Sequence, residues 1–310
     1  MEDKSKIRLT NGVYMPLVGL GTSHSGGYSH RAVVYALKDV GYRLIDTAKR
    51  YGTESFIPQA IDESCVPRED IFVSTKLWPT DYGFESTKTA FKGSLNRLGV
   101  DYIDLFLIHW PEVSSKCSDK WGTLVETWRS IETLYDSGLC RAIGVSNYGI
   151  EEFEKLLPES SITPHINQIE FHPFHNPNDL KQYCDDNKIQ IQGYSPLGEG
   201  YLVNEQIIKE MAYNHKRTAA QVLIRWSIQN SVPTIPKSTK ENRVKENFNV
   251  FDFQLNDNEM SLLNGLHEGR KYIDSSKIKD KIDEQLPDGY KLDIHLNEMT
   301  NSSQNNRQQS

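Results

Sequence analysis

The chain has 310 residues, 37% of them hydrophobic and 25% charged, and its 42 acidic against 35 basic residues give a net charge of −7. This is the composition of an ordinary globular protein, and the acidic balance argues against nucleic acid or an anionic membrane as the main partner. The first residues lack the apolar core of a signal peptide. Cys65, Cys117, Cys140 and Cys184 are far apart, which gives a disulfide framework or zinc ribbon little support. We therefore expect a cytoplasmic protein with reduced thiols that binds neither nucleic acid nor membranes.

The predicted elements begin with a β-hairpin and then alternate between strand and helix. The hairpin is expected around Asn11 and Gly12, because Asn-Gly is a strong turn signal. Short apolar runs then alternate with segments whose apolar residues recur at helical spacing. The expected strands are 17–21, 43–47, 71–77, 104–110, 141–146, 166–170, 189–195 and 232–235, and the expected helices are 30–40, 54–64, 85–98, 124–137, 150–157, 178–187, 205–215, 219–229 and 240–248.

Eight strands in repeated βα units predict a parallel sheet, and that number favours a closed (β/α)8 TIM barrel with the hairpin as an N-terminal cap. The open dinucleotide-binding sheet is disfavoured, because His24 stands where the third glycine of its G-x-G-x-x-G fingerprint belongs. The chain has no internal linker, so residues 1–301 are interpreted as one barrel domain with a C-terminal extension. Residues 302–310 are nearly all Ser, Asn and Gln and are expected to form a poorly ordered polar tail.

Three predicted strands carry chemically useful side chains at or next to their ends. The second strand has Asp46, the third Lys76 and the fourth His109, and Tyr51 follows the second strand in a polar turn. Because the C-terminal ends of parallel strands meet at one rim of a barrel, these side chains are expected to lie close together. Each alone has a structural explanation, as a turn residue, a solvated charge, a core group or a packing aromatic. The four together favour an active site.

The motifs around these residues make the sequence resemble the aldo-keto reductases over about residues 7–266. Eight motifs in the same order are far more specific than any one of them. They are GLGT (19–22), DTAKRYGTE (46–54), TKLW (75–78), LIHWP (107–111), GVSNY (144–148), NQIEFHP (167–173), GYSPLG (193–198), and IPKS followed by RVKENF (235–238 and 243–248).

The resemblance implies a reductase that converts aldehydes and ketones to alcohols with NADPH and without a metal. Tyr51 would be the general acid that protonates the carbonyl oxygen. A tyrosine has a pKa near 10, and the ammonium of Lys76 is expected to lower it by stabilising the phenolate. Asp46 would hold Lys76 charged and oriented, and His109 would donate a hydrogen bond to the carbonyl oxygen.

The resemblance also assigns the cofactor site. Ser146, Asn147 and Gln168 would hold the nicotinamide carboxamide, and Tyr194 would stack on the ring. Lys237, Ser238 and Arg243 form a basic cluster at the start of a predicted helix, which suits the 2′-phosphate of NADPH and predicts a preference over NADH. The remaining expected cofactor residues are Gly21, Thr22, Asp46, Ser195, Leu197, Gly198, Glu246 and Asn247.

The substrate pocket is less well defined. Trp78 and Trp110 match aromatic positions of the family's pocket and would line it with Tyr51 and His109. Ser23 replaces a tryptophan common in aldose-reductase-like members, which should leave one wall more open. Small reactive aldehydes and ketones are the expected substrates.

Two further questions concern the extension and the role of the protein. The sequence after residue 265 departs from the pattern of the vertebrate members, so sugar or steroid specificity does not follow from the resemblance. A monomer is expected. Two alternatives to an enzyme remain: an NADPH-binding regulatory module like the potassium-channel β-subunits, or a structural protein with the same fold.

Overall fold

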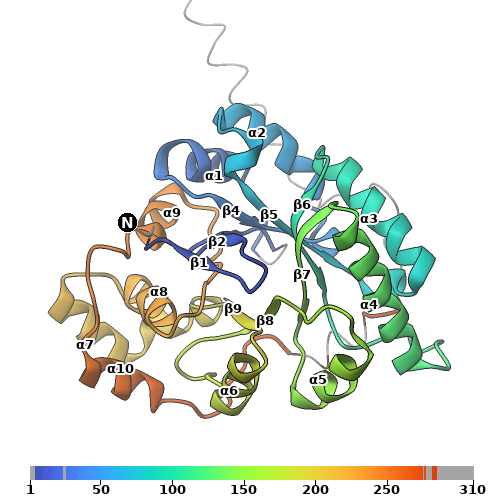
Figure 1. Cartoon of the computed structure of the whole chain (residues 1–310). Helices are drawn as coiled ribbons and strands as arrows, with labels where there is room; N and C mark the ends of the chain where they lie inside the picture. The colour runs from blue at the N-terminus through green and yellow to red at the C-terminus, as the bar shows by residue number, and fades with distance from the viewer. Residues whose placement is uncertain (1–3, 24–25, 275, 277–280, 285–310) are drawn as a thin grey trace, which may run out of the picture.

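The computed structural model describes residues 4–23, 26–274, 276 and 281–284. Its centre is a sheet of seven parallel strands, each hydrogen-bonded to the next one in the sequence, with helices around the outside (Figure 1). The predicted polar tail, 302–310, lies outside the described residues. The strands are β3 (Leu20–Gly21), β4 (Leu44–Asp46), β5 (Phe72–Leu77), β6 (Ile103–Ile108), β7 (Cys140–Ser146), β8 (Ile166–Glu170) and β9 (Gln190–Tyr194).

The segment 232–236 closes this sheet into a barrel, as the sequence predicts. Thr234 forms parallel bridges with Val18 before β3 and with Gly193 in β9. Its N–H donates to the Leu17 carbonyl at 2.8 Å, and its carbonyl accepts from the Gly19 N–H at 2.9 Å. Proline has no N–H for a ladder, so Pro233 and Pro236, before and after Thr234, limit the segment to isolated bridges. The expected eighth regular strand is therefore wrong, although the barrel is confirmed.

The helices follow the expected alternation, with one addition. The addition is α10 (Asp257–Asn264), which the pattern of apolar residues does not predict. Its signal in the sequence is a capping box, in which the Asn256 side chain accepts from the Glu259 N–H and the Glu259 carboxylate accepts from the Asn256 N–H. None of the helices in the described part of the chain is long and apolar enough to span a membrane. Their bounds are α1 (His30–Tyr35), α2 (Ile57–Ser64), α3 (Phe84–Leu98), α4 (Lys120–Asp136), α5 (Ile150–Leu156), α6 (Asn178–Asp186), α7 (Gln206–His215), α8 (Ala219–Gln229), α9 (Glu241–Phe248) and α10 (Asp257–Asn264).

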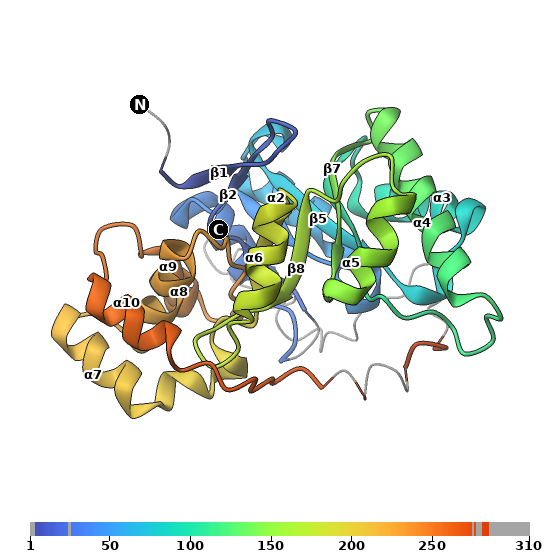
Figure 2. The same cartoon turned by 60° about the horizontal axis from the view of Figure 1, so that its bottom comes forward.

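The predicted hairpin is present and covers one end of the barrel. It pairs β1 (Lys6–Arg8) with β2 (Tyr14–Pro16) in antiparallel register. The fully buried Met15 belongs to one apolar cluster with Leu44, Phe72 and Leu105 of the barrel strands. Figure 2 shows the hairpin across the top of the barrel and the chain that follows α10 along the bottom. The hairpin therefore leaves the opposite end, where the strands finish, for a binding site.

The C-terminal segment follows α10 and runs along that opposite end. We use this name for residues 266–274 together with 281–284. The N–H groups of Glu268 and Arg270 both donate to the Phe174 carbonyl, at 3.2 and 3.1 Å. The ring of Tyr272 stacks on that of Tyr201, with centroids 5.6 Å apart and planes 7° apart. The segment is thereby fixed to the loops that follow β8 and β9.

Candidate active site

The C-terminal ends of β4, β5 and β6 bring Asp46, Lys76 and His109 to one rim of the barrel. Asp46 is in register with Ser74 of β5, and Lys76 is in register with Leu107 of β6. The main-chain N–H of His109 continues this ladder by donating to the Leu77 carbonyl at 3.1 Å. The parallel register thus brings together the three side chains that the sequence spaces widely.

Asp46 and Lys76 form an ion pair that is almost completely shielded from solvent. The Lys76 Nζ donates to Asp46 Oδ1 at 2.5 Å and to the Thr47 carbonyl at 3.0 Å. The other carboxylate oxygen of Asp46 accepts from Ser74 Oγ at 3.0 Å and from Gln168 Nε2 at 2.9 Å. Burial lowers the pKa of Lys76, and the adjacent Asp46 carboxylate opposes that change. The carboxylate therefore fixes the position of the ammonium and favours its charged form.

Tyr51 lies against this ion pair and beside His109. It ends a short 3₁₀ turn, Lys49–Tyr51, after β4. The Lys76 Nζ is 4.9 Å from the centre of the Tyr51 ring, and the His109 ring meets that ring edge-on with centroids 5.6 Å apart. The expected lowering of the Tyr51 pKa is wrong: burial, followed by the negative charge of Asp46, raises that pKa well above its ordinary value. Burial and the Asp46 charge therefore both favour the neutral phenol.

The four residues expected to bind the nicotinamide carboxamide and ring lie on, or directly after, the neighbouring strands β7, β8 and β9. Asn147, in the left-handed conformation with φ of 64°, donates to the His109 carbonyl at 3.0 Å and accepts from the Tyr194 hydroxyl at 2.7 Å. Ser146 Oγ donates to the Gln168 carbonyl at 2.7 Å. The side chain of Gln168 donates its amide hydrogens to Asp46 and to Gln192, which leaves its side-chain oxygen Oε1 as an acceptor on the wall. A carboxamide NH₂ fits such an acceptor.

The expected phosphate-binding residues lie at the other end of the same cavity. Lys237 and Ser238 follow the segment that closes the barrel, and the exposed Arg243 is in the first turns of α9. Burial lowers the pKa of Lys237, and the nearby Glu199 opposes that change. Cations, a hydroxyl and a helix N-terminus together suit a phosphate.

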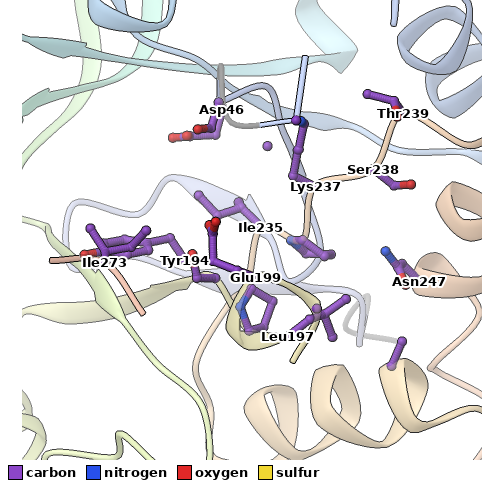
Figure 3. A pocket seen from close by; sticks show the side chains of 18 of the residues that line it. Asp46, Tyr194, Leu197, Glu199, Ile235, Lys237, Ser238, Thr239, Asn247 and Ile273 are labelled. Atoms are coloured by element: carbon purple, nitrogen blue, oxygen red, sulfur yellow. The ribbon is translucent and has the colours of Figure 1, made fainter. Parts of the chain in front are cut away.

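A single pocket of about 950 Å³ joins these two ends. Figure 3 shows Tyr194 and Ile273 at one end, Ser238, Thr239 and Asn247 at the other, and Lys237 between them. All but three of the site residues expected from the sequence line this pocket. The expected residues that do line the pocket are Gly21, Asp46, Tyr51, Trp78, His109, Trp110, Ser146, Asn147, Gln168, Tyr194, Ser195, Leu197, Lys237, Ser238, Arg243, Glu246 and Asn247.

The three exceptions are Thr22, Lys76 and Gly198. Thr22 donates from Oγ1 to the Asp46 carbonyl at 2.9 Å, so its hydroxyl supports the rim. Lys76 lies behind Asp46 with no exposed side-chain surface. Gly198 has φ of 53°, and a Cβ at this position would come within 2.6 Å of the Tyr272 ring. The glycine is therefore needed for the close approach of the C-terminal segment.

Comparison with known proteins identifies the family that this arrangement belongs to. The family model for the aldo/keto reductase family matches residues 17–268. The chain belongs to the aldo/keto reductase family. It is 48% identical over 285 residues to an uncharacterised oxidoreductase of Caenorhabditis elegans, covering 92% of this chain and 88% of that one. It is 42% identical over 270 residues to the glyoxal reductase of Bacillus subtilis, covering 86% and 95%.

A solved structure gives the same result. The Bombyx mori aldo-keto reductase, determined in complex with NADP, superposes with a TM-score of 0.82 at 33% identity and covers 89% of this chain and 96% of its own. Among the described residues of this aldo/keto reductase, no group of His, Cys, Asp or Glu side chains is arranged to hold a metal ion.

Several residues of the pocket wall were not predicted from the sequence. Arg50 is the neighbour of Tyr51 in the 3₁₀ turn, and Glu199 belongs to the loop after β9. Ile273 and Lys281 come from the C-terminal segment, and Ile273 packs against the expected aromatic wall of Trp78 and Trp110. Arg50 could have been predicted as a pocket residue from the sequence, because it directly precedes Tyr51. No local pattern indicates that the C-terminal segment reaches the pocket of this aldo/keto reductase.

Proposed function

We propose that this aldo/keto reductase reduces small aldehydes and ketones to alcohols with NADPH, with Tyr51 as the proton donor. The observation that carries the proposal is the contact of Tyr51 with both Lys76 and His109 at the floor of a pocket whose far end is basic. Tyr51 and His109 place two hydrogen-bond donors on the pocket wall, where a carbonyl oxygen could accept from both, and the Lys76 ammonium lies against the Tyr51 ring outside the pocket.

In this mechanism the side chains of the floor control the proton. NADPH, when bound, supplies the hydride to the carbonyl carbon. His109 orients the carbonyl oxygen, and Tyr51 gives its proton to that oxygen as negative charge develops on it. The raised pKa keeps Tyr51 protonated until this moment, because burial disfavours the phenolate in the resting site. The Lys76 ammonium, 4.9 Å from the ring centre, then stabilises the phenolate that is left.

The two ends of the pocket match the two ends of the cofactor. The side-chain oxygen of Gln168 would accept from the nicotinamide carboxamide, and Tyr194, fixed by its hydrogen bond to Asn147, would stack on the ring. Arg243 and Lys237 would bind the 2′-phosphate that distinguishes NADPH from NADH. The charge and the hydrogen-bond donors of this end support the assignment.

The experiment is an absorbance assay of NADPH oxidation with methylglyoxal, an aromatic aldehyde, an aldose, a quinone and a ketosteroid, with NADH run in parallel. Turnover with a clear preference for NADPH is expected. Arg243→Gln should reduce that preference by about 10-fold to 100-fold, since a charge-assisted contact to phosphate is lost. Lys245→Gln on the same helix is the control, because Lys245 is exposed and does not line the pocket. NADPH binding without turnover of any carbonyl would contradict the proposed reaction.

A further inference from the structure

Arg50 places a largely buried cation on the wall that carries the substrate-facing aromatic residues. It lies immediately before Tyr51 in the 3₁₀ turn after β4, and only 11% of its side chain is exposed. Its guanidinium carbon is 5.1 Å from the centre of the Trp78 ring. The same indole meets the His109 ring edge-on, with centroids 5.3 Å apart. The guanidinium and the imidazole are therefore separated by one indole on the same wall.

The guanidinium of Arg50 has few contacts for a group with so little solvent around it. Within the described part of the chain it donates one hydrogen bond, from Nη2 to Oε2 of Glu284 at 2.7 Å, although it has five N–H donors. The Glu284 side chain is 53% exposed. The neighbouring Lys49 is different, because it contacts both oxygens of Asp81 at 3.1 and 2.9 Å with both partners mostly buried. Lys49 is a structural cation, whereas Arg50 is paired with one accessible carboxylate.

The carboxylates that line the pocket are all engaged with groups other than Arg50. Among the described residues, the acidic side chains on the pocket wall are Asp46, Glu199 and Glu246. Asp46 is paired with Lys76, Glu199 attracts Lys237, and Glu246 accepts from Thr218 at 2.8 Å. None of these three carboxylates compensates Arg50.

A second cation reaches the pocket from the part of the C-terminal segment that carries Glu284. Lys281 lines the pocket, and Asp283, two residues later, accepts from Ser114 Oγ at 2.5 Å and from the Ser115 N–H at 3.2 Å. Residues 281–284 thus connect the loop after β6 with Arg50. Arg50 and Lys281 therefore place two cations on the pocket wall, and the half-exposed carboxylate of Glu284 is bound to Arg50.

We propose that Arg50 binds the carboxylate of an oxo acid substrate, and that Glu284 occupies this position when no such substrate is present. The inference rests on the proposed carbonyl reduction and specifies its substrate class: aldehydes or ketones that carry a carboxylate about one aromatic ring away from the carbonyl. The exchange replaces one carboxylate on the guanidinium by another, so the buried cation remains neutralised. A planar guanidinium can hold the incoming carboxylate with two parallel hydrogen bonds where Glu284 uses one.

The test compares two rigid probes that differ only in charge, 4-carboxybenzaldehyde and methyl 4-formylbenzoate, by kcat/KM with NADPH. For each variant, kcat/KM for the acid is divided by kcat/KM for the ester. This ratio is then divided by the same ratio for the wild type, which cancels the intrinsic reactivity of the two aldehydes. Arg50→Gln should lower this ratio by about 10-fold to 100-fold, as expected for a lost charge-assisted contact. Glu284→Gln should raise it several-fold, because the competing carboxylate is gone. Arg129→Gln, which removes an arginine from an exposed ion pair with Glu159 on the surface, should leave it unchanged.

The outcomes separate this inference from the proposed function. If the ester is reduced and Arg50→Gln slows both probes equally, Arg50 only supports the wall and the inference is overturned. If the Arg50 variant does not fold, Glu284→Gln decides, because an unchanged or lowered ratio contradicts the exchange of carboxylates. If the wild type reduces neither these probes nor any compound of the carbonyl panel, the proposed function fails, and this inference fails with it.

Discussion

The floor and the cover of the pocket are held in place in different ways. The floor consists of Asp46, Lys76 and His109 at adjacent strand ends, where the main-chain ladder and a buried ion pair fix every position. The cover is the C-terminal segment, which is held by side chains and single main-chain groups. Glu170 at the end of β8 accepts from the N–H groups of Tyr272 and Ile273 at 2.7 and 3.2 Å. The difference teaches that the cover can change without disturbing the groups that we propose carry out the reaction.

The largest effect is expected from Tyr51, the proposed proton donor of the floor. Tyr51→Phe should lower kcat by about 100-fold to 10,000-fold, because general acid catalysis typically contributes that much. NADPH should still bind, since the ring is retained and only the hydroxyl is lost. Steady-state turnover and NADPH fluorescence titration measure the two properties. Tyr213→Phe is the matched control, because Tyr213 is 84% exposed on α7. Equal activity of the two variants would contradict the assignment of Tyr51 as the proton donor.

Breaking the ion pair of the floor should affect both stability and rate. Lys76→Met leaves the Asp46 carboxylate buried without its cation, which should cost about 3–5 kcal/mol of unfolding free energy. Urea unfolding measures this loss, and the rate should fall because the Tyr51 phenolate has lost its ammonium. Adding Asp46→Asn should restore part of the stability but not the rate. Lys88→Met removes a surface pair with the exposed Glu85 and should change stability by less than about 1 kcal/mol.

Breaking the cover should change substrate binding and leave the cofactor in place. Glu170→Gln weakens the two hydrogen bonds that hold Tyr272 and Ile273, so KM for the carbonyl should rise about 3-fold to 10-fold, as expected for roughly 1 kcal/mol. The Kd for NADPH should stay the same. Glu154→Gln, an exposed carboxylate on α5, is the control. A loss of NADPH affinity in the Glu170 variant would show that the cover and the cofactor site are not independent.

The attachment of the cover also has a defined pH dependence. Burial alone would raise the pKa of Glu170, but hydrogen bonds from His172 and from the N–H groups of Tyr272 and Ile273 outweigh it, and the pKa lies below its ordinary value. A lowered carboxyl pKa stabilises the folded form above the ordinary carboxyl range, and this stabilisation is lost only as the pH falls through the lowered value. Limited proteolysis of the C-terminal segment should therefore be unchanged at neutral pH and increase only in acid.

The smallest effect is expected for the pH dependence of the rate near neutrality. Proton donation requires the neutral phenol, which predominates at every pH below its pKa. Because burial and Asp46 raise the pKa of Tyr51, kcat for reduction should be constant between about pH 6 and pH 8. A pH profile at saturating substrate measures this. A decline of kcat with rising pH inside that range would mean that the phenol ionises more easily than its surroundings indicate.

The floor could be predicted from the sequence because its information is local. Each strand is a short apolar run, successive strands are neighbours in the barrel, and side chains at successive strand ends must therefore meet. The raised pKa of Tyr51 could not be predicted in this way, because it depends on how deeply the ring is buried and on its position relative to Asp46 as well as Lys76.

The cover could not be predicted because its contacts join residues that are remote in the sequence. Glu170 and Tyr272 are 102 positions apart, Ser114 and Asp283 are 169 apart, and Arg50 and Glu284 are 234 apart. No periodicity connects such pairs. The closing segment of the barrel is an intermediate case, since its proline residues were visible but the main-chain bonds of Thr234 to both neighbouring strands were not.

The hairpin at the start of the chain has a practical consequence for handling the protein. It covers the barrel end that is opposite to the pocket, with Met15 inserted among the strand residues (Figure 2). A purification tag or a surface linker joined ahead of Lys6 would therefore face away from the entrance. An enzyme immobilised through that end on a bead or an electrode should keep the KM that it has in solution.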